Sequence, residues 1–140
     1  MTLFQHPFYR YHLPVIALAI AIFILSSISQ LNPPDLGFEI QDKFYHFVFY
    51  TMFGFLIARS FSVLNVSPFF HRYFLIFAVV FSAVYGLSDE IHQYFVPGRF
   101  CSIGDFVADS LGGVAGVFIY RQHQQLRSLF RKYFLRKKKN

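Results

Sequence analysis

The sequence predicts an all-α fold, a four-transmembrane-helix bundle in a single domain. Composition is the first reason, since 55% of the 140 residues are hydrophobic and 14% are charged, whereas soluble domains have about 25% charged residues. The second is that apolar residues form four runs of about the length that a transmembrane helix needs. The third is that proline or glycine separates the runs. The same composition excludes disorder, and the single cysteine, Cys101, excludes a disulfide scaffold.

Residues that interrupt helices separate the predicted spans. The four predicted spans are residues 13–31, 43–62, 73–95 and 105–120. Asn32-Pro33-Pro34 ends the first span, because proline removes a backbone donor and restricts the residue before it. Pro68 lies in the next loop, and Pro97-Gly98 ends the third span. Ser102 and Asp105 resemble a capping box that opens the fourth. A cleavable signal peptide is the alternative for the first run, but its length favours a membrane span.

Basic residues gather on one side of the predicted bundle. Segments 1–12, 62–72 and 121–140, with the adjoining helix ends, carry eleven basic residues and no acidic one. The opposite side carries all seven acidic residues and two basic ones. Since Lys and Arg collect on the cytoplasmic face, we expect a multi-pass protein of the cell (inner) membrane with cytoplasmic termini. The acidic side then faces outward.

The tail, residues 121–140, combines basic charge with apolar residues at helical spacing: Leu126, Leu129, Phe130, Tyr133 and Phe134. This pattern is typical of an amphipathic helix on an anionic lipid surface. We therefore interpret the tail as a cytoplasmic membrane anchor outside the domain of residues 13–120, and not as a nucleic-acid-binding segment. Membrane lipids are the expected partners. The sequence leaves open whether the chain forms a homo-oligomer.

Ionisable residues lie at the outer ends of three predicted spans. They occur as Asp42-Lys43-x-x-His46, as Asp89-Glu90-x-x-Gln93, and as Asp105 and Asp109 after a loop with Arg99 and Ser102. Gly112 and Gly116 follow as a GxxxG pattern, which lets another helix approach closely. Acids at helix N-termini are explained as caps, whereas Asp89 and Glu90 lie near a C-terminus, where the helix dipole disfavours them. We expect Lys43, His46 and Arg99 to compensate them.

The candidate binding site therefore has ten residues: Asp42, Lys43, His46, Asp89, Glu90, Gln93, Arg99, Ser102, Asp105 and Asp109. Ionisable groups near a bilayer are functional candidates, although a structural charge network is the alternative. His46 and Glu90 are the candidate catalytic acid or base. Ser102 is a possible nucleophile, but its position favours a helix cap.

Two other kinds of site receive less support. His46, His92, Glu90 and the aspartates are residue types that bind divalent metals, but no HExxH-like spacing occurs, so neither a metal nor another cofactor is predicted. A proton or ion relay would need ionisable residues in the inner half of the bundle, where almost none occur.

The motifs resemble those of the VanZ-like family of small bacterial membrane proteins. The matching residues are Asp42-Lys43-x-x-His46, Asp89-Glu90-x-x-Gln93, Pro97-x-Arg99-x-x-Ser102-x-x-Asp105, Gly112 and Gly116. Asp109 departs from the pattern, which usually has Asn there. The resemblance implies a multi-pass inner-membrane protein, and the family is named for a protein linked to teicoplanin resistance. Because families carry many functions, the likeness alone does not make this chain a resistance factor.

Two functions follow as expectations. The first is an outward-facing site that binds an envelope lipid, a lipid-linked molecule or a glycopeptide, with Lys43, His46 and Arg99 holding a phosphate or carboxylate. An effect on teicoplanin susceptibility belongs to this expectation. The second is a membrane-embedded hydrolase or transferase on a lipid-linked substrate, with His46 or Glu90 as general base. The sequence leaves open whether the protein is an enzyme.

Overall fold

The computed structural model describes residues 6–29, 37 and 40–137, and the elements in these ranges are all helical. The predicted all-α class is thus confirmed. The helices are α1 (Leu13–Ser26), α2 (Gln41–Phe61), α3 (Pro68–Tyr94) and α4 (Ile103–Lys137), and a π-helical turn, η2 (Phe8–His12), leads into α1. The predicted stop at Asn32-Pro33-Pro34 and the end of the first span lie outside the described residues.

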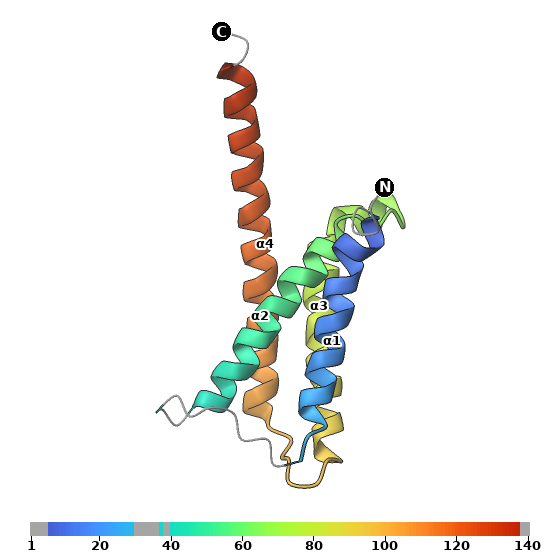
Figure 1. Cartoon of the computed structure of the whole chain (residues 1–140), viewed down its shortest axis with the longest axis vertical. Coiled ribbons are helices and arrows are strands. Elements are labelled where there is room, and N and C mark those ends of the chain that lie inside the picture. The colour runs from blue at the N-terminus through green and yellow to red at the C-terminus, as the bar shows by residue number, and fades with distance from the viewer. Residues whose placement is uncertain (1–5, 30–36, 38–39, 138–140) are drawn as a thin grey trace.

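The helices run alternately up and down (Figure 1). The start of α1 lies beside the end of α2, where His12 Nδ1 is 2.7 Å from Ser60 Oγ. The end of α1 lies beside the end of α3, where Ser27 Oγ is 2.9 Å from His92 Nε2. The start of α1 and the end of α4 therefore point to the same side of the bundle (Figure 1). Because of this alternation, α2 and α4 run parallel to each other.

Three helical segments are long and apolar enough to cross a membrane: Phe8–Ser26, Pro68–Tyr94 and Ile103–Lys137. Helix α2 has 21 residues but is not one of these segments, since Asp42, Lys43, His46 and Arg59 interrupt its apolar sequence. A fourth crossing by α2 stays a prediction. Helix α3 begins five residues before the predicted boundary at residue 73, because the side chain of Ser67 caps it by accepting a hydrogen bond from Phe70 N at 3.0 Å.

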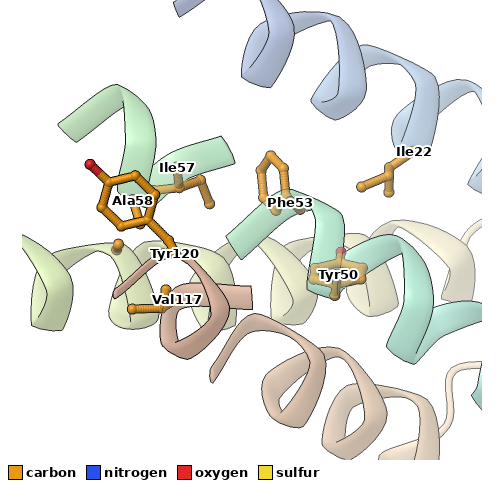
Figure 2. Close-up of a cluster of buried hydrophobic side chains, with 8 residues drawn as sticks. Ile22, Tyr50, Phe53, Ile57, Ala58, Val117 and Tyr120 are labelled. Atoms are coloured by element: carbon orange, nitrogen blue, oxygen red, sulfur yellow. The ribbon is translucent and has the colours of Figure 1, made fainter. Parts of the chain in front are cut away.

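The core is built mainly on α2. Tyr50, Phe53 and Ile57 occupy successive turns of that helix and are each 1% exposed. Figure 2 shows them between Ile22 of α1 and Val117 of α4. The outside of the bundle is apolar as well, with large side chains exposed on α1, α3 and α4, among them Ile20, Ile76, Val84, Leu111 and Phe118. Such a surface is typical of a protein that contacts lipid or a partner.

Small residues let α2 and α4 pack backbone to backbone. A Cβ atom on Gly112 would meet the carbonyl oxygen of Phe47, and one on Gly116 would meet the carbonyl oxygen of Thr51. Gly54 of α2 and Gly113 of α4 lie directly against each other in the same contact. The close helix approach predicted from Gly112 and Gly116 is therefore confirmed.

Helix α4 continues without a break from the bundle into the tail. It has 35 residues, a length of about 52 Å at 1.5 Å per residue. Residues 121–137 are helical, as the spacing of apolar residues predicts, and every one of them is exposed. The predicted limit after Tyr120 is therefore a change of environment along one helix and not a helix boundary.

Candidate functional site

The polar ends of α2, α3 and α4 meet at one end of the bundle, the lower end in Figure 1. At their centre, His46 Nδ1 lies 2.9 Å from Asp109 Oδ1 and 3.9 Å from Glu90 Oε1. We call His46, Glu90 and Asp109 the central cluster. The two acidic side chains are 2% and 0% exposed, whereas that of His46 is 14% exposed. The imidazole is thus the member of the cluster that reaches the surface.

Two glycines make room for these side chains. Gly86 of α3 faces Asp109, and a Cβ atom there would lie 3.0 Å from the Cβ of Asp109. Gly104, in the first turn of α4, faces Lys43, and a Cβ atom there would lie 2.7 Å from the Cε of Lys43. Neither glycine is predicted as part of the site. The signal that identifies them is a glycine within one helical turn of a polar motif, since Gly86 precedes Asp89 by three residues and Gly104 directly precedes Asp105.

An ion pair lies beside the central cluster. Lys43 Nζ donates to Asp105 Oδ1 at 3.1 Å, with the lysine side chain 44% exposed and the aspartate 6%. Asp42 is exposed, and one of its oxygens lies within 4.8 Å of ligand atoms of His46 and Asp105. The motif of α2 therefore faces both acids of α4, an arrangement consistent with the close packing predicted from Gly112 and Gly116.

Glu90 is positioned by the start of α4. The backbone N–H of Ser102 donates to Glu90 Oε2 at 2.8 Å, and the hydroxyl of Ser102 lies 3.4 Å from the backbone nitrogen of Asp105. Ser102 is thus the cap that the sequence predicts. In a capping box the third helical residue would accept the Ser102 N–H. Here Glu90 of α3 accepts it, which leaves Asp105 for Lys43.

Three other predicted site residues, Asp89, Gln93 and Arg99, make their contacts outside the central cluster. Gln93 Nε2 donates to Asp89 Oδ2 at 3.1 Å, so Asp89 receives a hydrogen bond from a side chain of its own helix, α3. Arg99 is expected to compensate the acids, but its Nη2 donates to the carbonyl of Leu25 at 3.0 Å. Among the described residues it forms no ion pair with an acidic side chain. That expectation was wrong, because carbonyls in the last turn of a helix lack their usual i+4 donors. The guanidinium adds to the 3.3 Å hydrogen bond that the Leu25 carbonyl receives from the Ile28 N–H.

The site holds more buried negative groups than positive ones. Asp89, Glu90, Asp105 and Asp109 are each at most 4% exposed. The basic groups beside them are Lys43, whose side chain is 44% exposed, and His46, whose side chain is 14% exposed. Glu90 Oε1 and Asp109 Oδ2 are buried without a hydrogen-bond partner, and so is the hydroxyl of Tyr50. Unsatisfied buried carboxylate oxygens are costly. The cluster is therefore suited to accept donors or a cation from outside the chain.

The central cluster also has the arrangement of a general base. Where His46 Nδ1 carries the proton, it donates to Asp109, and Nε2 is left to take a proton from another molecule. A carboxylate that orients an imidazole in this way is a common feature of acid–base and nucleophilic catalysis.

A model of the VanZ/LLP1 family matches residues 4–130. The chain belongs to this family. The match extends beyond the motifs quoted above, from the approach to α1 into the exposed part of α4. Comparisons with curated proteins and with solved structures gave no match. As a VanZ-family chain with three helices able to cross a bilayer, it is a membrane protein.

Proposed function

We propose that this VanZ-family protein crosses the cell (inner) membrane four times and binds the polar head group of an envelope lipid or lipid-linked molecule. The binding site is the central cluster together with Lys43 and Asp105, facing outward. Helix α2 is the fourth span. Its 21 residues reach about 32 Å, it lies against α4 along the glycine contact, and it begins and ends beside the ends of the other helices (Figure 1).

Charge supports the proposed orientation. Arg59 and Arg72 lie at the end of the bundle opposite the cluster, and residues 121–137 leave the bundle at that end with further basic residues. Lys and Arg next to short loops favour the cytoplasm. The acidic cluster then lies at the outer surface, and Asp109, six residues into α4, is about 9 Å along the helix axis from its start. This is roughly the depth of lipid head groups and the adjoining acyl chains.

One observation carries the binding proposal: buried carboxylate oxygens without partners lie directly beside two cations that are partly exposed. Lys43 and His46 offer donors to a phosphate, as charge-assisted hydrogen bonds require. Glu90 and Asp109 accept hydrogen bonds from hydroxyls of a sugar or glycerol. A head group that combines phosphate with hydroxyls therefore matches both the donors and the carboxylates of the site.

Binding is tested with purified protein in nanodiscs of neutral lipid, titrated with a polyprenyl phosphate or with phosphatidylglycerol. The two probes distinguish a lipid-linked carrier from an ordinary phospholipid. We expect Lys43→Ala and Glu90→Gln to weaken binding at least about tenfold, the loss of one charge-assisted contact. His92→Gln is the matched control, since His92 contacts Ser27 and Phe23 and not the cluster. Unchanged affinity in both site variants would refute the proposal.

An enzyme is the second candidate, and the contact between His46 and Asp109 favours it. In this reading the protein is a hydrolase or transferase on a lipid-linked substrate, with His46 as general base. Release of phosphate from a polyprenyl diphosphate by the purified protein, abolished in His46→Ala and kept in His92→Ala, would support it. Binding without any turnover of this substrate class would favour the first candidate.

In cells, we propose that the protein affects susceptibility to teicoplanin. Cells that express the protein are compared with cells that express Glu90→Gln at equal membrane levels. A change in the inhibitory concentration that depends on Glu90 is expected. Equal susceptibility of the two strains would separate the binding site from antibiotic resistance.

A further inference from the structure

The strongest unexplained feature is a pair of buried carboxylate oxygens in the central cluster. Glu90 Oε1 and Asp109 Oδ2 have no hydrogen-bond partner, although their side chains are 2% and 0% exposed. Two carboxylates share this space with one imidazole. In such surroundings uncompensated negative charge is strongly unfavourable, so the arrangement calls for a cation with at least two charges.

We propose that His46, Glu90 and Asp109 bind one divalent transition-metal ion. Each offers a ligand atom, and these atoms all lie within 4.8 Å of one another. His46 Nδ1 lies 2.9 Å from the Asp109 carboxylate and 3.9 Å from that of Glu90. Neighbouring ligand atoms that are each about 2.1 Å from zinc lie roughly 3.0–3.4 Å apart, a range between these two distances. The charge of the ion cancels that of the two carboxylates.

The contact around Glu90 supports this assignment. The Ser102 N–H holds Oε2 at 2.8 Å, while Oε1 is left pointing to the imidazole. Metal-binding carboxylates are commonly oriented in this way by a hydrogen bond to their second oxygen. A structural charge clamp would be expected to use both oxygens, whereas here the oxygen without a partner is the one nearest the histidine.

A second group, Asp42, His46 and Asp105, also has ligand atoms within 4.8 Å of one another. It is the weaker candidate, because Asp105 already pairs with Lys43 and Asp42 is exposed. An ammonium group beside an intended ligand repels a metal ion. The two groups share His46, so they are not independent sites.

The ligand set indicates the ion. One imidazole nitrogen with two carboxylates suits Zn²⁺ or Mn²⁺, whereas Mg²⁺ and Ca²⁺ prefer oxygen ligands alone. Three protein ligands leave a position open for another molecule. In the proposed binding site that position would accept a phosphate oxygen. The inference thus rests on the same site as the proposed function, but its test needs no lipid.

The experiment uses the full chain in detergent micelles, first stripped with a chelator and then dialysed against Zn²⁺, Mn²⁺ or Mg²⁺ alone. Elemental analysis is expected to give one equivalent of Zn²⁺ or Mn²⁺ and no bound Mg²⁺. His46→Gln, Glu90→Gln and Asp109→Asn should each weaken binding at least about tenfold. His92→Gln is the matched histidine control and should bind like the unmodified chain.

A spectroscopic readout keeps the test independent of folding yield. Co²⁺ added to the stripped protein should show d–d absorption bands that change in His46→Gln and persist in His92→Gln. Failure of the full chain to bind either Zn²⁺ or Mn²⁺ would overturn the metal assignment. Unchanged metal binding in Glu90→Gln and Asp109→Asn would also overturn it. So would a loss of metal binding that occurs only in Asp42→Asn and Asp105→Asn. Head-group binding by stripped protein would then leave the proposed function standing, whereas metal binding without head-group binding would refute that function and not the metal site.

Discussion

The two halves of α4 have opposite surroundings within one continuous helix. In the first half, Ile103 to Tyr120, eight residues are buried, among them two acids and three glycines. In the second half, residues 121–137, every residue is exposed and the charges are basic. Backbone geometry is the same in both halves. Side-chain size and the sign of the charge therefore decide which half joins the bundle and which half leaves it.

The contrast shows how a short chain builds a polar site in an apolar protein. Glycine removes side-chain volume where α4 meets α2, and this close contact brings Asp105 and Asp109 to Lys43 and His46. The second half has no glycine. Its side chains stay exposed, although His123 at its start still contacts the ring of Phe55. Close helix packing and the polar site are thus coupled in the first half only.

The largest expected effect is an all-or-none difference in access from the two sides of the membrane. Cys101 is exposed just before α4, and Ser128 is exposed in the second half. A membrane-impermeant thiol reagent added to intact spheroplasts should label Cys101. It should not label a cysteine introduced by Ser128→Cys in a Cys101→Ser background until the cells are lysed. The opposite pattern would invert the proposed topology and place the cluster in the cytoplasm.

The next effect is on stability, at the glycine contact. Gly116→Ala places a methyl group on the carbonyl oxygen of Thr51, so α2 and α4 must separate. We expect a loss of about 3 kcal/mol, the upper range for overpacking a core. Ser128→Ala in the exposed half should change stability by less than about 0.5 kcal/mol. Thermal or denaturant unfolding of the two variants in detergent measures both, and equal effects would show that the halves do not differ in packing.

Much of the fold follows from the sequence, because the apolar runs and their breaks are separate along the chain. The all-α class, the close approach at Gly112 and Gly116, and the cap at Ser102 are all confirmed. The continuation of α4 past Tyr120 is not predicted. Neither proline nor glycine follows that residue, so no local signal ends the helix there, and the change from apolar to basic sequence marks only a change of surroundings.

The site is predicted as a set of residues but not as a geometry. Helical spacing brings Asp42, Lys43 and His46 to one side of α2, yet spacing along one helix does not show which acid each cation contacts. Arg99 illustrates the gap, since its partner is a carbonyl of α1, a group that carries no sequence signal. The pairing of His46 with Asp109 depends on how α2 and α4 rotate against each other, which the glycines determine in three dimensions.

A smaller effect distinguishes a functional site from a structural clamp in the first half. In metal-free protein, Glu90→Gln removes a buried charge whose Oε1 has no partner, while the amide oxygen still accepts the Ser102 N–H. We expect stability to rise by about 1 kcal/mol, the order of an unsatisfied buried group. A higher melting temperature together with lost binding would indicate a site that costs stability. A clear fall in the melting temperature would instead indicate that Glu90 holds the helices together.

The smallest effect on bundle stability is expected from deleting residues 126–140. The deleted residues that the structure describes are all exposed, so unfolding in neutral nanodiscs should change by less than about 0.5 kcal/mol. In nanodiscs with phosphatidylglycerol the full chain should melt at a higher temperature than in neutral lipid, because each basic residue near an anionic surface contributes about 1 kcal/mol. The deletion should abolish this lipid-dependent gain, and Arg127→Ala should reduce it only slightly. A gain that persists in the deleted chain would show that the anionic lipid acts on the bundle itself, and the second half of α4 would then have no role in binding the membrane surface.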